Sequence, residues 1–103
     1  MRIDYTFRNL ESSETIKEHA AEKIGKLQKY FRAPIDAEVT FSLERHQFSI
    51  DVKVTADGLA YLGREESEDL NTSVDKVVNK IRTQVTRDKS ASAQRRRSSP
   101  PVE

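Results

Sequence analysis

Hydrophobic and polar residues alternate along three segments of the chain. Every second side chain is apolar in residues 2–8, 35–44 and 48–56. A period of two is typical of a β-strand that buries one face. Asp57-Gly58 is a strong signal for a two-residue hairpin turn, and residues 59–64 after it predict a fourth, shorter strand. The pattern therefore predicts a sheet with one apolar face.

Two further segments carry apolar residues at spacings of three and four, which is typical of a helix that buries one side. The first helix is expected to begin after an N-cap at Ser13 and to end near Phe31. The second is expected over Glu68 to Lys89, with Ser67 as its candidate N-cap. The predicted core positions are Ile16, Ala20, Ile24, Leu27 and Phe31 in the first helix and Leu70, Val74, Val77, Val78, Ile81 and Val85 in the second.

The predicted order of elements is β-α-β-β-β-α, which defines an α+β fold. The first crossover makes the first two strands parallel, and the hairpins make the others antiparallel. Both helices must cover the single apolar face of this four-stranded mixed sheet. We expect residues 1–89 to form this one domain. Residues 90–103 are small and polar, with three arginines and two prolines, and predict a disordered basic tail.

The formal net charge of +1 conceals an uneven distribution along the chain. Residues 1–75 carry 10 Lys and Arg against 15 Asp and Glu, whereas residues 76–103 carry 8 against 2. A cationic end of this kind can attract a polyanion although the whole chain is nearly neutral. The outer face of the sheet is expected to be acidic and to repel phosphate, because it would carry Asp4, Asp36, Glu38, Glu44 and Asp51.

The cations of the second helix lie away from its apolar stripe. Helical spacing places Lys76, Lys80 and Arg87 together opposite the core, with Arg82 and Lys89 at one flank. The first helix and the residue after it add Lys23, Lys26, Lys29 and Arg32. Charged rows on helices are usually solvated faces. The alternative is a surface that follows nucleic-acid phosphates, and both interpretations stay open at this point.

Little in the sequence favours an enzyme. The chain has no cysteine, and its two histidines, His19 and His46, are far apart in sequence. It has neither a glycine-rich phosphate loop nor the spacing of metal ligands. We therefore expect no catalytic site, no metal and no cofactor. A signal peptide and an apolar run long enough to cross a membrane are also absent, which predicts a cytoplasmic protein.

Over residues 1–89 the chain resembles the family of ribosome hibernation-promoting factors and protein Y, short form. The resemblance lies in the opening strand, in EKIGKLQKYF, in the Asp57-Gly58 turn and in EDLNTSVDKVVNKIRTQVTRDK. Asn71 and Ser73 depart from it, because the family usually has tyrosine and alanine there. The positions of the second helix that match the family motif are Glu68, Asp69, Asp75, Lys80, Ile81, Gln84, Val85, Arg87 and Lys89.

The resemblance implies a role in translation. Family members bind the small (30S) ribosomal subunit at the decoding centre, where they block mRNA and the A- and P-site tRNAs under stress or in stationary phase. It implies that Lys80, Arg87 and Lys89 contact 16S rRNA. The helix-face argument adds Lys76, Arg82, Lys23, Lys26, Lys29 and Arg32, and the tail arginines Arg95, Arg96 and Arg97 would add non-specific attraction. Ribosome modulation factor is a possible further partner, and the free protein is expected to be a monomer.

Two other functions remain as alternatives. A general double-stranded RNA-binding domain would also place a basic helix end above packed strands, but it would bind any long RNA duplex with comparable affinity. The ribosome-binding factor would instead bind small subunits saturably, and tRNA and mRNA would oppose that binding. A small α+β enzyme would lose its function when His19 and His46 are both substituted. The first two interpretations predict almost no effect of that double change.

Overall fold

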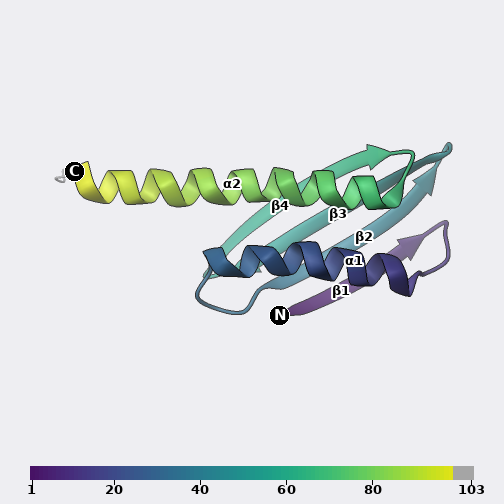
Figure 1. The fold of residues 1–103 in the computed structure, drawn as a ribbon, viewed down its shortest axis with the longest axis horizontal. Helices are drawn as coiled ribbons and strands as arrows, with labels where there is room; N and C mark the ends of the chain where they lie inside the picture. Colours follow the sequence, from purple (N-terminus) through teal and green to yellow (C-terminus); the bar gives the residue numbers. More distant parts are fainter. Residues whose placement is uncertain (99–103) are drawn as a thin grey trace.

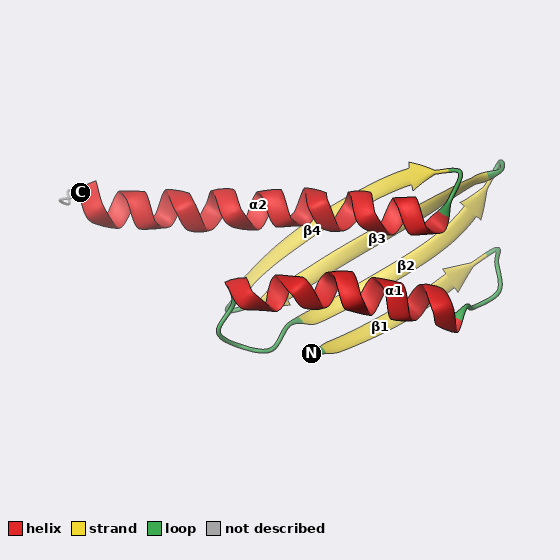
Figure 2. Ribbon diagram, in the orientation of Figure 1, coloured by secondary structure: helices red, strands yellow, loops and turns green. Residues whose placement is uncertain are grey.

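A four-stranded sheet in the order β1-β2-β3-β4 carries both long helices on one face (Figure 1). The structure, a computed structural model, describes the backbone of residues 1–98 and the side chains of residues 1–89. It confirms the predicted α+β fold and the order β-α-β-β-β-α (Figure 2). The elements are β1 (Arg2–Arg8), α1 (Glu14–Gly25), the 3₁₀ helix η1 (Lys26–Tyr30), β2 (Asp36–Glu44), β3 (Gln47–Ala56), β4 (Leu59–Ser67) and α2 (Leu70–Ser98).

The strand pairing follows the predicted connections. β1 is parallel to β2, with Phe7 opposite Phe41, and β2–β3 and β3–β4 are antiparallel. The β3–β4 turn is Asp57-Gly58, in which both residues have positive φ, as a two-residue hairpin of this twist requires. Arg45 and His46 form the β2–β3 turn, also with positive φ. β3 begins at Gln47, one residue before the start that the alternating pattern predicts.

One hydrophobic core lies between the sheet and the helices. Val39, Phe41, Ile50 and Val54 line the sheet side and are at most 1% exposed. Burying a side chain of this kind contributes about 1.5–3 kcal/mol to folding, so this layer contributes substantially to stability. Every predicted helix core position is buried except Leu70, which is partly buried.

Helix α2 approaches β4 most closely at Gly63. A Cβ atom there would lie 3.0 Å from Cγ2 of Val77 and 3.1 Å from Cγ1 of Ile81. Two side chains of α2 also donate hydrogen bonds to β4 carbonyls: Gln84 Nε2 to Leu62 O at 2.9 Å and Lys80 Nζ to Arg64 O at 3.3 Å. These contacts fix both the position and the rotation of α2 on the sheet.

The N-terminus of α2 differs from the prediction. Asp69 caps the helix, because its Oδ2 accepts hydrogen bonds from the backbone N–H of Thr72 at 3.0 Å and from its hydroxyl at 2.8 Å. These bonds, the hydroxyl first, lower the pKa of Asp69. The prediction that Ser67 is the N-cap is wrong, since β4 extends to Ser67. Its Oγ instead lies 2.7 Å from Oγ of Ser73.

The C-terminal half of α2 is longer than the hydrophobic pattern indicates. The helix continues to Ser98, although its apolar stripe stops at Val85. Alanine, glutamine and arginine beyond Lys89 favour a helix through intrinsic propensity rather than burial. The division into a domain of residues 1–89 and a separate tail stays a prediction, and residues 99–103 lie outside the described residues.

Two contacts hold the far end of the domain together. The hydroxyl of Tyr61 on β4 donates to Oδ2 of Asp88 on α2 at 2.6 Å, and burial together with this carboxylate raises the pKa of Tyr61 to about 12. The carboxylate of Asp57 accepts the backbone N–H groups of Arg32 and Ala33, both at 2.9 Å. The loop after η1 is therefore fastened to the β3–β4 turn.

The different surroundings of Gly63 and Gly25 predict opposite effects on stability when each glycine is substituted. Gly63→Val should destabilise the domain by about 1–3 kcal/mol, because the added methyl groups overlap Val77 and Ile81. Gly25→Ala is the control: its Cβ would meet only the side chain of Met1, Cε at 3.6 Å and Sδ at 3.9 Å, so it should stabilise α1 by about 0.4–1 kcal/mol. Urea unfolding measures both. A Gly63→Val domain as stable as the wild type would contradict the packing of α2 described above.

The anchoring role of Asp57 predicts a dependence of stability on pH. The two backbone N–H groups it accepts lower the pKa of its carboxyl group, so folding favours the ionised form. Its contribution should therefore be complete at pH 7 and disappear as the pH falls below about 4. Asp57→Asn keeps a residue that tolerates the positive φ of 55°. Urea unfolding should show a deficit for this variant at pH 7 that shrinks in acid.

The exposed strand substitution Asp36→Asn serves as the control for this experiment, because the structure gives Asp36 no comparable hydrogen bonds within the described residues. A constant deficit of Asp57→Asn from pH 7 to pH 3 would show that the carboxylate charge does not act at this position.

Candidate functional site

A groove of about 310 Å³ runs between α1–η1 and α2 and is lined by four cationic side chains. Leu27 and Val78 are almost fully buried and form its floor. Asp75 is the one carboxylate among the described lining residues. The cations are Lys23, Lys26, Lys29 and Arg82.

The spacing of the lysines explains why they share one side. They recur at every third residue across the junction of α1 and η1. Residues three apart lie on neighbouring positions of an α-helix and superpose in a 3₁₀ helix. Arg82 follows the buried Ile81, which places it about 100° around α2 from the core, on the flank that faces α1. The sequence analysis places Arg82 at a flank of the helix, apart from the row of Lys76, Lys80 and Arg87. In the structure Arg82 lines the groove.

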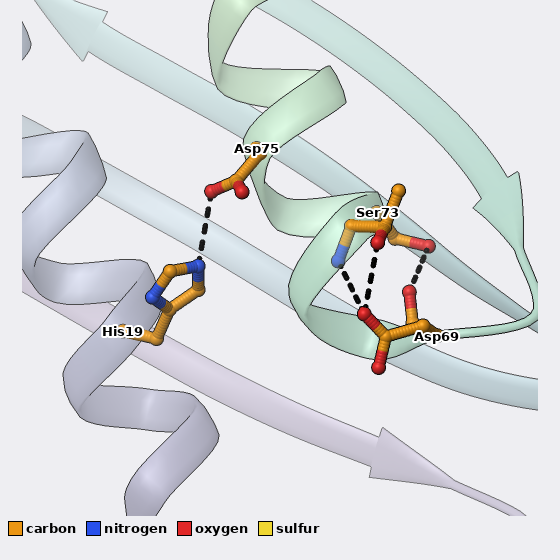
Figure 3. Close-up of polar contacts among 5 residues, drawn as sticks. His19, Asp69, Ser73 and Asp75 are labelled. Atoms are coloured by element: carbon orange, nitrogen blue, oxygen red, sulfur yellow. Dashed lines mark hydrogen bonds and ion pairs between the residues drawn. The ribbon is translucent and has the colours of Figure 1, made fainter.

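The positive charge of the groove is not neutralised by ion pairs among the described residues. Among the described residues, the ion pairs include none of the four cations of the groove. Lys29 Nζ lies 5.4 Å from the ring centroid of Tyr30, which offers a weak cation–π contact. Asp75 is already engaged, because its Oδ1 lies 3.0 Å from Nε2 of His19 (Figure 3). Four cations thus face solvent against one partnered carboxylate.

Lys80 lies on the other flank of α2, beside β4, and helical spacing puts Lys76 and Arg87 on the same side of the helix. That the three act together as a binding surface stays a prediction. However, Lys80 Nζ forms an ion pair with Oε2 of Glu65 at 2.7 Å. Such a half-exposed pair contributes about 0–1 kcal/mol, so a polyanion can compete for Lys80, but its charge is not free.

The remaining predicted cations lie at the end of the domain that contains the β3–β4 turn. Lys89 Nζ is 5.1 Å from the ring centroid of Phe31, and the charges of Lys89 and Arg32 help to lower the pKa of Asp57, after the larger effect of its backbone hydrogen bonds. Both cations therefore surround a carboxylate of the same chain. The backbone of Arg95, Arg96 and Arg97 belongs to α2, and their side chains lie outside the described residues.

The sheet face away from the helices has mixed charge. The predicted acidic positions do lie there, but cations alternate with them more than expected. Arg64 binds Asp51 at 2.7 Å and Glu66 at 3.1 Å, and these hydrogen bonds raise its pKa. Lys53 is paired in register with Glu38 on β2. Among the described residues, this face therefore carries carboxylates between its cations and offers no cationic row comparable to the groove.

The described residues hold no group of three or more His, Cys, Asp or Glu placed to bind a metal ion. None of the described helices is long and apolar enough to cross a membrane.

His19 lies on α1, whereas His46 lies in the exposed β2–β3 turn. The link from His19 to Asp75 was missed in the sequence. No pattern in the sequence pairs these two residues, which are 56 positions apart.

Comparisons with known proteins agree with the fold. A family described as Sigma 54 modulation protein / S30EA ribosomal protein matches residues 3–92. The ribosome hibernation promotion factor of Bacillus subtilis is 29% identical over 92 residues, which cover 84% of this chain and 49% of that protein. The chain thus spans about half the length of this relative. The ribosome hibernation promoting factor of Salmonella typhimurium is 26% identical over 89 residues, 86% of this chain and 94% of that protein.

Solved structures show the same architecture. The N-terminal domain of Thermus thermophilus Protein Y superposes with a TM-score of 0.78 at 28% identity, covering 84% of this chain and 98% of that domain. A ribosomal subunit interface protein from Coxiella burnetii reaches a TM-score of 0.74 at 21% identity, covering 87% of this chain and 99% of that one, and supports the fold alone. With a matching family over residues 3–92 and the fold of its relatives, the chain belongs to the Sigma 54 modulation protein / S30EA ribosomal protein family.

Proposed function

We propose that this chain is a ribosome hibernation factor that binds the small (30S) ribosomal subunit at the decoding centre. The names of its relatives support a ribosome-associated role. The observation that carries the binding site is the groove between α1–η1 and α2. It presents Lys23, Lys26, Lys29 and Arg82 to solvent, and the ion pairs of the described residues include none of them.

The chemistry of the groove suits a phosphate backbone. Lysine and arginine side chains that neutralise phosphates release condensed counterions, which gives affinity without reading the base sequence. Structured RNA is recognised largely by shape and backbone contacts, so base-reading side chains are not needed. In this proposal the groove follows 16S rRNA phosphates, and Lys76 and Arg87 on the outer surface of α2 extend the contact. Lys80, Lys89 and Arg32 join it when RNA replaces their contacts within the chain.

The proposed mechanism is occupation rather than catalysis. A domain held in the decoding channel excludes mRNA and the A- and P-site tRNAs, so translation stops while the domain is bound. The outer face of the sheet, with its carboxylates, would point away from rRNA and thus define one orientation. The proposed ribosome partner places the chain in the cytoplasm. Cooperation with ribosome modulation factor stays a prediction.

Two pairs of charge-neutralising substitutions rank the cationic surfaces. Lys26→Gln with Arg82→Gln removes two free groove charges and should weaken binding to 30S subunits about 10- to 100-fold near 0.1 M salt. Lys80→Gln with Arg87→Gln removes the same charge from the other flank. It should weaken binding less, because Lys80 is already paired with Glu65. Fluorescence titration of purified subunits at several salt concentrations measures both affinities.

Lys53→Gln on the outer face of the sheet is the control for surface charge and should leave binding unchanged. A larger loss for the Lys80 and Arg87 pair than for the groove pair would show that the groove is not the main RNA contact.

Competition distinguishes the proposed site from a general double-stranded RNA-binding domain. Binding to 30S subunits should saturate at one site and be displaced by mRNA together with tRNA. A long RNA duplex should compete only weakly with the 30S subunit for the protein, because the duplex does not have the shape of the RNA that lines the decoding channel. Cosedimentation with increasing competitor provides the measurement. Equal affinity for an unrelated duplex, with no displacement by tRNA, would favour the alternative function.

A further inference from the structure

His19 on α1 and Asp75 on α2 join the two helices at the edge of the cationic groove. His19 Nε2 lies 3.0 Å from Asp75 Oδ1, and Figure 3 shows the imidazole pointing across the gap between the helices to this carboxylate. The two side chains are 24% and 49% exposed, so the pair remains open to protons from solvent. Asp75 is also the one carboxylate among the residues that line the groove.

The charge of Asp75 opposes the groove's proposed ligand. The lining residues carry four positive charges and this one negative charge. A neutral His19 donates a hydrogen bond to Asp75 but leaves the negative charge in place. A protonated His19 offsets it. Because lysine, arginine and phosphodiester groups keep their charges between pH 5.5 and 8, histidine is the side chain that titrates in this range.

Other charged groups also face His19. Asp69 at the start of α2 is close enough for the charge of His19 to contribute to its lowered pKa, although the hydrogen bonds from Thr72 contribute more. On α1, Glu22 and Lys23 lie one turn further along the helix, and Glu18 is the preceding residue. Asp75 of α2 contacts the imidazole directly and brings it to the edge of the groove.

We propose that the His19–Asp75 pair makes the affinity of the groove for a phosphate backbone depend on pH. This inference rests on the proposed function and adds its regulation. When the imidazole takes up a proton, the positive charge at the groove increases by one, and phosphate binds more tightly. Equally, a bound polyanion favours the protonated imidazole, so binding takes up a proton. Asp75 limits affinity at alkaline pH, and His19 relieves that limit in mild acid.

The test uses the full chain, purified 30S subunits and buffers of constant ionic strength at pH 5.5 and pH 8.0. The wild type should bind roughly three- to fivefold more tightly at the lower pH. This gain in affinity is smaller than the contribution of one fully neutralised phosphate. His19→Gln keeps a hydrogen-bond donor for Asp75 but cannot titrate, and its affinity should be the same at both pH values. Asp75→Asn should bind about threefold more tightly than the wild type at pH 8.0, because it removes the opposing charge.

His46→Gln is the matched control, because it removes the chain's other histidine from an exposed turn on a different element. It should keep the wild-type dependence on pH. Thermal melts at both pH values establish that each variant is folded.

Two results would overturn the inference and leave the proposed function intact. One is a His19→Gln variant with the wild-type dependence on pH. The other is an Asp75→Asn variant that is folded but binds no more tightly than the wild type at pH 8.0. Failure of the wild type to bind 30S subunits saturably at either pH would instead contradict the proposed function itself.

Discussion

The packing of α2 against β4 at Gly63 is the constraint on which the rest of the structure depends. Val77 and Ile81 can approach the strand only because Gly63 has no side chain. Gln84 and Lys80 then reach β4 carbonyls from one flank of the helix. With the rotation of α2 set in this way, the opposite flank must face α1. The division of the cations between a groove and a second flank follows from this single contact.

The groove gathers like charges, and the fold must stabilise that arrangement. Lys23, Lys26 and Lys29 lie on one side because they recur at every third residue and α1 passes directly into η1. Buried side chains beneath them hold both helices on the sheet, and the Tyr61–Asp88 hydrogen bond fixes α2 near the end of the domain. The free energy for keeping the cations together therefore comes from the hydrophobic core. A surface of unpaired cations of this kind is suited to a partner that supplies the counter-charge.

The sequence predicted the fold well because each element has a clear period. Alternation defined β1, β2 and β3, and the Asp57-Gly58 signal defined the last hairpin. The N-cap of α2 was misplaced because Ser67, Glu68 and Asp69 are all plausible at a helix start, and only the pairing of Ser67 with Phe48 shows that β4 is still present there. The end of α2 was also set too early, since hydrophobic periodicity does not register residues that are helical by propensity alone.

The candidate site was only partly predictable for a different reason. Helical periodicity gives the angles between side chains on one helix, but not which flank faces a neighbour. Arg82 was therefore identified as a candidate cation, but its position in the groove was not predicted. The ion pair of Lys80 with Glu65 was not foreseen, because the predicted fourth strand ended before Glu65, whereas β4 includes it. His19 and Asp75 are separated by 56 positions, and only the packing of α1 beside α2 brings them together.

The central claim is that the groove side of the molecule faces ribosomal RNA and the outer face of the sheet does not. Because the chain has no cysteine, a single cysteine can carry a tethered iron chelate that cleaves nearby RNA. The informative positions are Asn79, which lines the groove, and Lys53, on the opposite face of the sheet. In complexes with 30S subunits, the account predicts cleavage of 16S rRNA in the decoding region from Asn79→Cys and little cleavage from Lys53→Cys. Strong cleavage from Lys53→Cys with none from Asn79→Cys would contradict it.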